Sequence, residues 1–155
     1  MSTTLPPGAG DTAADDTAPG ERRPQAGVGA VVFHRGRVLL VRRARAPNAG
    51  QWAIPGGRVA WGESLRAAAE REVLEETGVR IRAGEPVFAF DVIEGSGAHC
   101  TRHYVVVDLA AEYLGGEPRG GDDALEARWV GADELDALAV NSTTRRLLRE
   151  RYDFG

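Results

Sequence analysis

The stretch from Ser64 to Gly78 limits the fold more strongly than any other part of this chain. Ser64 is a suitable N-cap, and Leu65, Ala69 and Val73 recur at the spacing of one helix face. Gly78 stands where a helix commonly ends, because glycine readily adopts the left-handed conformation that follows the last turn. The sequence therefore predicts a helix from Ser64 to Thr77 with both of its ends marked.

This predicted helix carries three glutamates on one face. Glu72, Glu75 and Glu76 are spaced so that a helix, turning roughly 100° per residue, brings them together. Like charges at this spacing repel by about 0.2–0.5 kcal/mol per pair, and Arg71 offsets only part of that cost. A solvated acidic helix face is the plain alternative. A hard divalent cation, however, requires such a group of carboxylates, and Mg²⁺ is usually held this way together with substrate phosphates.

The glutamates belong to a longer pattern of fixed spacing. Counting from Gly57, a glutamate follows after five intervening residues, and an Arg-Glu pair follows after seven more. The pattern then continues through an aliphatic residue, Glu-Glu, glycine and a final aliphatic residue. The segment resembles the Nudix box, and every specified position is filled, by Gly57, Glu63, Arg71, Glu72, Val73, Glu75, Glu76, Gly78 and Val79. A chance match at this many positions is far less expected than for a short glycine motif.

The resemblance implies a role for each residue of the box. Glu72, Glu75 and Glu76 would be metal ligands, with the carbonyl of Gly56 as a further ligand. Arg71 would orient the glutamates by ion pairing, and Glu63 would brace the junction of loop and helix. Gly57 suits a tight turn where a side chain would obstruct the metal or a phosphate. The implied cofactor is Mg²⁺, for which Mn²⁺ can substitute.

The resemblance also implies an α+β fold, the Nudix α/β/α sandwich with a mixed β-sheet. At 155 residues, the chain has room for one domain. Residues 1–24 are rich in Pro, Gly, Ala, Thr and Asp, which predicts a disordered tail. Residues 25–155 are expected to form the Nudix domain. Strands are expected at 28–33, 38–41, 87–93, 104–110 and 127–130, and helical pieces at 133–138 and 142–151. A short apolar run at 52–54 leads into a turn at 55–57.

Relatives often recruit another acid from outside the box to the metal site. The candidates are Asp122, Asp123 and Glu126, whose alternative role is that of solvated loop carboxylates. We expect at least one of the three to face the metals.

Substrate-binding candidates lie where relatives of the 8-oxo-dGTP diphosphatase type place theirs. Arg42 and Arg43 follow the second predicted strand and would contact phosphate or nucleoside, although exposed strand-end arginines are an equal alternative. Asn141 falls where those relatives read the base. It is also a common type of helix N-cap, which is the stronger interpretation.

The remaining chemistry-bearing residues suggest structural roles. Trp52 and Trp129 are expected in the core, His34, His99 and His103 match no zinc spacing, and no partner set activates Cys100.

Charge and cysteine usage restrict the setting and the partners. One cysteine rules out an internal disulfide and favours a reducing, cytoplasmic location. A net charge of −4 offers no basic face for nucleic acid, and no segment predicts a signal peptide or a membrane span. We expect a small nucleotide as the partner, with no nucleic acid and no membrane, and a homodimer remains open.

These observations predict a Mg²⁺-dependent hydrolase that cuts a phosphoanhydride bond in a nucleoside diphosphate-linked substrate and releases a nucleoside monophosphate. Both a (d)NTP and a nucleotide sugar such as ADP-ribose stay open as substrates.

The proline expected beyond the box in ADP-ribose-type relatives is absent, since Ile93, Glu94 and Gly95 occupy that region. A non-catalytic Nudix-like sensor of ADP-ribose is the alternative, but sensors usually carry a degraded box. An isopentenyl-diphosphate isomerase would need a longer chain and a cysteine–glutamate arrangement that this sequence lacks.

Overall fold

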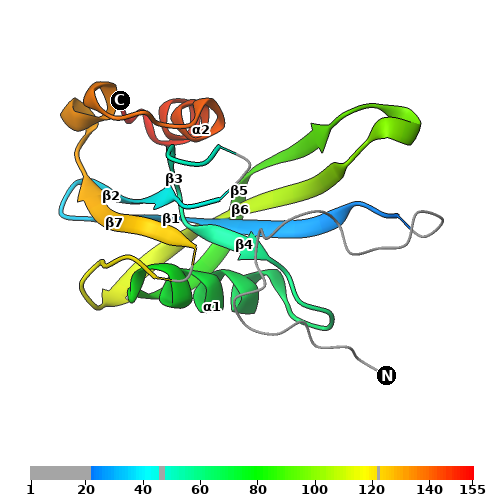
Figure 1. Ribbon diagram of the computed structural model, residues 1–155. Coiled ribbons are helices and arrows are strands. Elements are labelled where there is room, and N and C mark those ends of the chain that lie inside the picture. Colours follow the sequence, from blue (N-terminus) through cyan, green and yellow to red (C-terminus); the bar gives the residue numbers. More distant parts are fainter. Residues whose placement is uncertain (1–21, 46–47, 122) are drawn as a thin grey trace.

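The computed structural model describes residues 22–45, 48–121 and 123–155 (Figure 1). Most of the predicted tail, residues 1–21, lies outside them. The elements in chain order are β1 (Gln25–His34), β2 (Arg37–Arg43), β3 (Trp52–Ala53), β4 (Gly56–Arg58), α1 (Leu65–Thr77), β5 (Arg80–Glu94), η2 (Gly97–His99), β6 (Arg102–Gly115), β7 (Ala124–Val130), η3 (Ala132–Ala137) and α2 (Ser142–Tyr152). Within the described ranges, no helix is long and apolar enough to cross a membrane.

The strands form one mixed sheet. Its main path runs β3-β2-β1-β6-β5, with β4 added beside β1 and β7 beside β2. The central pair, β1 with β6, is parallel, whereas β1 pairs antiparallel with β2 and with β4, and β5 antiparallel with β6. In Figure 1, α1 lies below the sheet, and α2 lies above it. The predicted sandwich of helix, mixed sheet and helix is confirmed.

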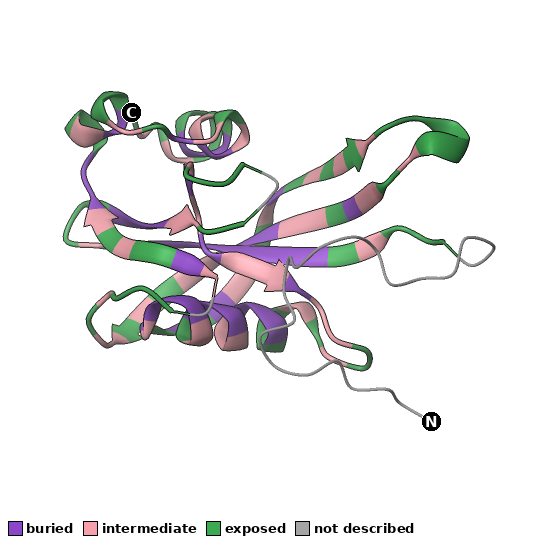
Figure 2. Cartoon of the chain, viewed as in Figure 1, coloured by how far each residue is buried: buried purple, intermediate pink, exposed green. Residues whose placement is uncertain are grey.

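Two apolar cores, one on each face of the sheet, hold these layers together. Because successive strand residues point to opposite faces, β1 sends Val28, Ala30 and Val32 into the core with α1, and Val31 into the core with α2. Strand β2 does the same, since Leu39 packs on the α1 side, and Leu40 on the α2 side. Figure 2 shows the burial concentrated along these inner strands. Their apolar runs are continuous because both faces are covered.

Helix α1 begins and ends as its sequence predicts. The Ser64 hydroxyl accepts a hydrogen bond from the Ala67 N–H at 3.1 Å. Gly78 adopts a left-handed φ of 75°, and its N–H donates to the Leu74 carbonyl. Ala68, Ala69 and Val73 are buried against the sheet. The buried surface of the helix also includes the polar residues Glu72, Glu76 and Thr77.

The predicted turn at 55–57 is partly strand, because β4 pairs with β1 through Gly29↔Gly56 and Val28↔Gly57. Glycine makes this approach feasible, since a Cβ on Gly56 would lie 2.1 Å from the Val28 carbonyl oxygen.

Strand β5 starts well before the predicted Val87. The ladder with β6 shifts register on both sides of Pro86, so the strand passes this proline through irregular pairing instead of starting after it.

The left-handed end of α1 gives a direct stability test. We expect Gly78→Ala to lower the free energy of unfolding by about 1 kcal/mol, because a Cβ disfavours positive φ. Gly78→Asn is the matched control and should cost less, since asparagine tolerates this conformation. Urea unfolding of both variants measures the difference, and equal losses would contradict the role given to φ.

Candidate active site

The three glutamates of α1 lie on the flank of the helix that meets β4. Glu72 and Glu76 are only 5% and 7% exposed, which is unusual for glutamate. Glu75 is more accessible, with 21% of its side chain exposed. Buried carboxylates need partners to compensate for lost hydration. The surroundings of each carboxylate therefore decide whether this cluster is stable.

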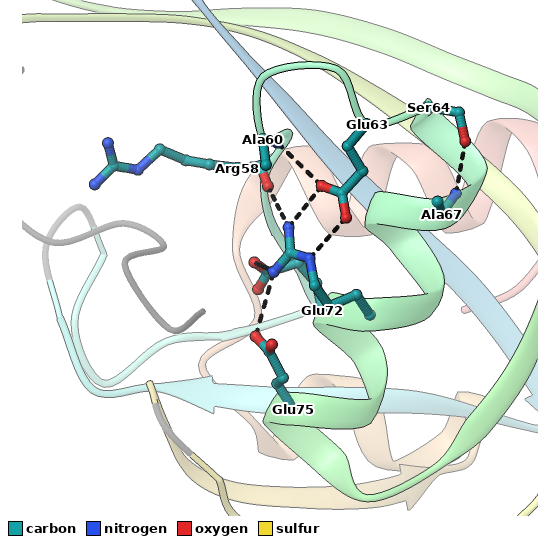
Figure 3. A network of polar contacts seen from close by, with 8 residues as sticks. Arg58, Ala60, Glu63, Ser64, Ala67, Glu72 and Glu75 are labelled. Carbon is teal, nitrogen blue, oxygen red and sulfur yellow. Dashed lines mark hydrogen bonds and ion pairs between the residues drawn. The ribbon is translucent and has the colours of Figure 1, made fainter. Parts of the chain in front are cut away.

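Arg71 supplies most of those partners. Its guanidinium makes a two-pronged contact with Glu63, through Nε at 2.8 Å and Nη2 at 2.9 Å. Its Nη1 donates to Glu72 at 2.6 Å and to Glu75 at 3.3 Å, and Nη2 also donates to the Arg58 carbonyl. Figure 3 shows Glu63, Glu72 and Glu75 directed toward one region beside the helix. One cation thus orders three carboxylates and ties the preceding loop to α1.

Electrostatics follow from this geometry. The hydrogen bond from Arg71 lowers the pKa of Glu63, against the raising effect of partial burial, and the Ala60 N–H lowers it further. The same bond to Glu63 raises the pKa of Arg71 above its usual range. Both groups therefore stay charged at neutral pH, as the predicted brace requires.

Gly56 and Gly57 bring the backbone of β4 directly against the glutamates. A Cβ on Gly57 would lie 2.3 Å from Oε2 of Glu72, so no side chain fits there. The Gly56 N–H donates to Oε2 of Glu76 at 3.3 Å. The carboxylates thus lie beside the backbone of Gly56 and Gly57, and their hard oxygens are the ligand type that Mg²⁺ prefers. The residues present therefore fit a divalent cation.

The carboxylates do not yet converge on one point. Among the described residues, no three His, Cys, Asp or Glu side chains form a ready metal-holding group. Nη1 of Arg71 contacts both Glu72 and Glu75. To hold a cation, Glu72 and Glu75 would therefore have to bind the metal and Arg71 at the same time.

The predicted acids outside the box lie on the loop before β7 and on β7 itself. Asp123 pairs with Nε of Arg45 at 2.8 Å, and Glu126 pairs with Nε of Arg42 at 3.2 Å. Asp122 lies outside the described residues. Gly121 nevertheless packs against the carbonyls of Glu75 and Glu76, where a Cβ would come within 2.2 Å. The loop reaches the glutamate end of α1, and recruitment of one of its acids stays a prediction.

A pocket begins at Gly56 and Gly57 and extends between the sheet and the start of α2. Arg43 and Asn141 line it, together with the aromatic and aliphatic side chains of Phe90, Tyr104, Val106 and Ile54. Asn141 also caps α2, because its Oδ1 accepts from the N–H groups of Thr143 and Thr144. Arg42 is not among the lining residues and pairs with Glu126 instead. Of the predicted substrate-binding residues, the structure brings Arg43 and Asn141 together.

Asp108 is the residue of this pocket that the sequence analysis missed. It lies in the middle of β6, is 3% exposed, and lines the pocket opposite α2. Burial raises the pKa of its carboxyl to about 7. Within the run Val105-Val106-Val107-Asp108-Leu109, a lone aspartate among apolar strand residues is the signal that could have identified it.

The aromatic residues divide between core and surface. Trp52 is buried, with the Arg128 guanidinium 5.1 Å from its ring centroid, and Trp129 packs on Tyr113 and His34. The core positions expected for Trp52 and Trp129 are confirmed. Trp61 is 75% exposed in the loop before α1.

The chain is similar to a known domain family, to known proteins and to solved structures. Residues 23–150 match the NUDIX domain. An ADP-ribose pyrophosphatase of Methanocaldococcus jannaschii is 30% identical over 120 residues, which cover 76% of this chain and 68% of that protein. A Mycobacterium tuberculosis protein named "Putative 8-oxo-dGTP diphosphatase 2" is 43% identical over 102 residues, covering 63% and 67%. The crystal structure of a MutT NUDIX hydrolase from Burkholderia pseudomallei superposes with a TM-score of 0.72 at 34% identity, covering 84% of this chain and 99% of that one.

The Arg71 network predicts a specific loss of stability. Arg71→Ala removes every bond of the guanidinium and leaves three carboxylates to repel, so we expect a loss of about 1–3 kcal/mol in urea unfolding. Arg71→Lys keeps the charge but not the planar fork, and should recover only part of it. Because the folded pKa of Glu63 is lowered, its stabilisation is present above the unfolded pKa and is lost as pH falls through the folded value. This acid-side loss should shrink in Arg71→Ala, and an unchanged profile would contradict the pairing.

Asp108 predicts the opposite pH dependence. Its folded pKa is raised to about 7, above the unfolded value. The neutral carboxyl therefore adds to the free energy of unfolding at low pH, and this contribution is lost as pH rises through about 7. Burial raises the pKa of the nearby Tyr152 phenol, and the charge of Asp108 raises it further. We expect wild-type protein to lose about 2–4 kcal/mol between pH 4.5 and 8 from this group alone. Asp108→Asn should lack this component, and parallel stability profiles would disprove it.

Proposed function

We propose that this chain, which belongs to the NUDIX family and is a Nudix pyrophosphohydrolase, uses Mg²⁺ to cleave a phosphoanhydride bond in a substrate with one nucleoside. The expected product is a nucleoside monophosphate. The substrate class covers a (d)NTP and a nucleotide sugar such as ADP-ribose. The names of two relatives, "ADP-ribose pyrophosphatase" and "Putative 8-oxo-dGTP diphosphatase 2", fall within the same class.

One observation carries this proposal. The glutamate cluster and the pocket meet at the same two glycines, because Gly57 lies against Glu72, Gly56 donates to Glu76, and both glycines line the pocket. A nucleotide whose base enters the pocket would therefore extend its phosphates toward the carboxylates. Arg43, at the same pocket, is suited to contact the phosphates as a cation.

The metal would be held by Glu72, Glu75, Glu76 and the carbonyl of Gly56. When bound, the cation supplies neutralisation of the phosphate charge and a lower pKa for the attacking water. Mg²⁺ fits this all-oxygen set, and Mn²⁺ is expected to substitute. Arg71 keeps Glu72 and Glu75 aligned, while Glu63 fixes Arg71 to the loop. One of the carboxylates takes the proton of the attacking water.

Glu76→Gln tests the metal role while retaining side-chain volume and an oxygen for the Gly56 N–H. We expect turnover to fall on the order of 100-fold. Loss of a group that only supports a metal ligand costs about 10–100-fold, and loss of a ligand itself should cost at least as much. Calorimetric titration should show weaker Mg²⁺ binding, with the unfolding midpoint nearly unchanged. Glu150→Gln, an exposed glutamate of α2, is the matched control and should behave as wild type.

The same assay identifies the bond that is cut. Hydrolysis in ¹⁸O-water should place the label on a phosphate product, because water attacks phosphorus and no covalent nucleophile is implied. Label on a sugar carbon, or full turnover by Glu76→Gln at limiting Mg²⁺, would overturn the proposal.

A further inference from the structure

Asp108 is held at the floor of the pocket by the pairing of β1 with β6. It stands beside Gly29 in the parallel register, and its neighbours Val107 and Leu109 face the other side of the sheet, toward α1. A Cβ on Gly29 would lie 2.3 Å from Oδ1 of Asp108. The carboxyl therefore lies over a bare stretch of backbone and points into the space between β1 and the start of α2.

This carboxyl is buried without a polar partner among the described residues. It is 3% exposed, yet no hydrogen bond or ion pair joins it to another described side chain or backbone group, and loss of hydration alone raises its pKa. Buried polar groups in folded proteins are nearly always hydrogen-bonded, since an unmet one costs stability. A valine would fill a similar volume at no such cost. The aspartate is thus poised for a partner that the folded chain does not itself provide.

The pocket indicates what that partner is. Phe90, Tyr104, Val106 and Ile54 offer apolar and aromatic surface, which suits the faces of a flat ring. The open end leads to Gly56 and Gly57 beside the glutamates, where the phosphates of a nucleotide would lie. A ring held between the apolar walls would present its polar edge to the floor, where Asp108 lies.

We propose that Asp108 is a specificity-determining residue that accepts a hydrogen bond from the exocyclic amino group of the nucleobase. This inference rests on the proposed function of the site and deepens it by naming the substrate class as amino-bearing bases. An ionised carboxylate accepts from two adjacent N–H groups, as on the guanine edge. A neutral carboxyl accepts from the amino group and donates to the neighbouring ring nitrogen of adenine or cytosine. The amino group is recognised in both states, so the assignment does not depend on the protonation of Asp108.

Binding of nucleoside monophosphates tests the proposal without relying on turnover. Isothermal titration should compare GMP with IMP, which lacks only the 2-amino group, and CMP with UMP, in which a carbonyl replaces the amino group. Wild-type protein should favour the amino-bearing member of at least one pair by about 10–100-fold, the effect of one buried polar group left unpaired. Asp108→Val should bring that ratio close to one. Asp108→Asn, which adds an amide donor, should narrow or reverse it.

The controls separate reading of the base from structural and metal roles. Glu112→Gln changes an exposed carboxylate on the same strand and should keep the wild-type ratio. Both Asp108 variants should melt at or above the wild-type temperature, because they remove a buried carboxyl that has no polar partner among the described residues. If the valine variant fails to fold, the binding ratio of the asparagine variant tests the proposal. An unchanged ratio, a uniform loss of affinity for all bases, or no discrimination by wild-type protein would each overturn the proposal. Selective binding without hydrolysis would instead contradict the proposed function and leave Asp108 as the base-reading group.

Discussion

The guanidinium of Arg71 is the contact on which the acidic half of the site depends. Glu72 and Glu75 belong to the same helix face, and Glu63 comes from the loop before it, so their charges would push the loop away from the helix. A planar guanidinium can bind Glu63 with two parallel bonds and still donate to Glu72 and Glu75, whereas a lysine ammonium lacks this fork and has only three donors. The network also reaches the Arg58 carbonyl at the end of β4. A single side chain therefore joins strand, loop and helix, and the position of the carboxylates relative to the sheet follows from it.

Close backbone approach is the second constraint. Gly29, Gly56 and Gly57 lie on neighbouring strands, and each lacks a side chain where a carboxyl or a carbonyl occupies the space. Gly57 makes room for Glu72, and Gly29 makes room for Asp108. These glycines thus lie between the acidic cluster and the apolar pocket, and the proposed nucleotide would reach both.

Local patterns in the sequence predicted the parts of the structure that are local. The caps at Ser64 and Gly78, the shared face of the three glutamates and the Arg71 pairing all follow from helix geometry within one segment. The strand character of Gly56–Arg58 did not, because it depends on pairing with β1 far away in the chain. The burial of Asp108 is hidden for the same reason, since a strand aspartate normally faces water and only the packing of β1 and α2 encloses it. Asn141 combines both kinds of feature. Its cap of α2 follows from the local sequence, whereas its place in the pocket wall depends on the packing of distant segments.

The parallel pairing of β1 with β6 has a consequence for the order of folding. About half of the chain separates Gly29 from Asp108, so closing this pair costs more chain entropy than forming α1 or the β5–β6 hairpin. Contacts between distant segments form slowly, whereas helices and hairpins form early. The glutamate helix should therefore exist before the pocket floor does. A newly made chain would form the helix that carries its acidic cluster before it buries Asp108, the residue proposed to select the base.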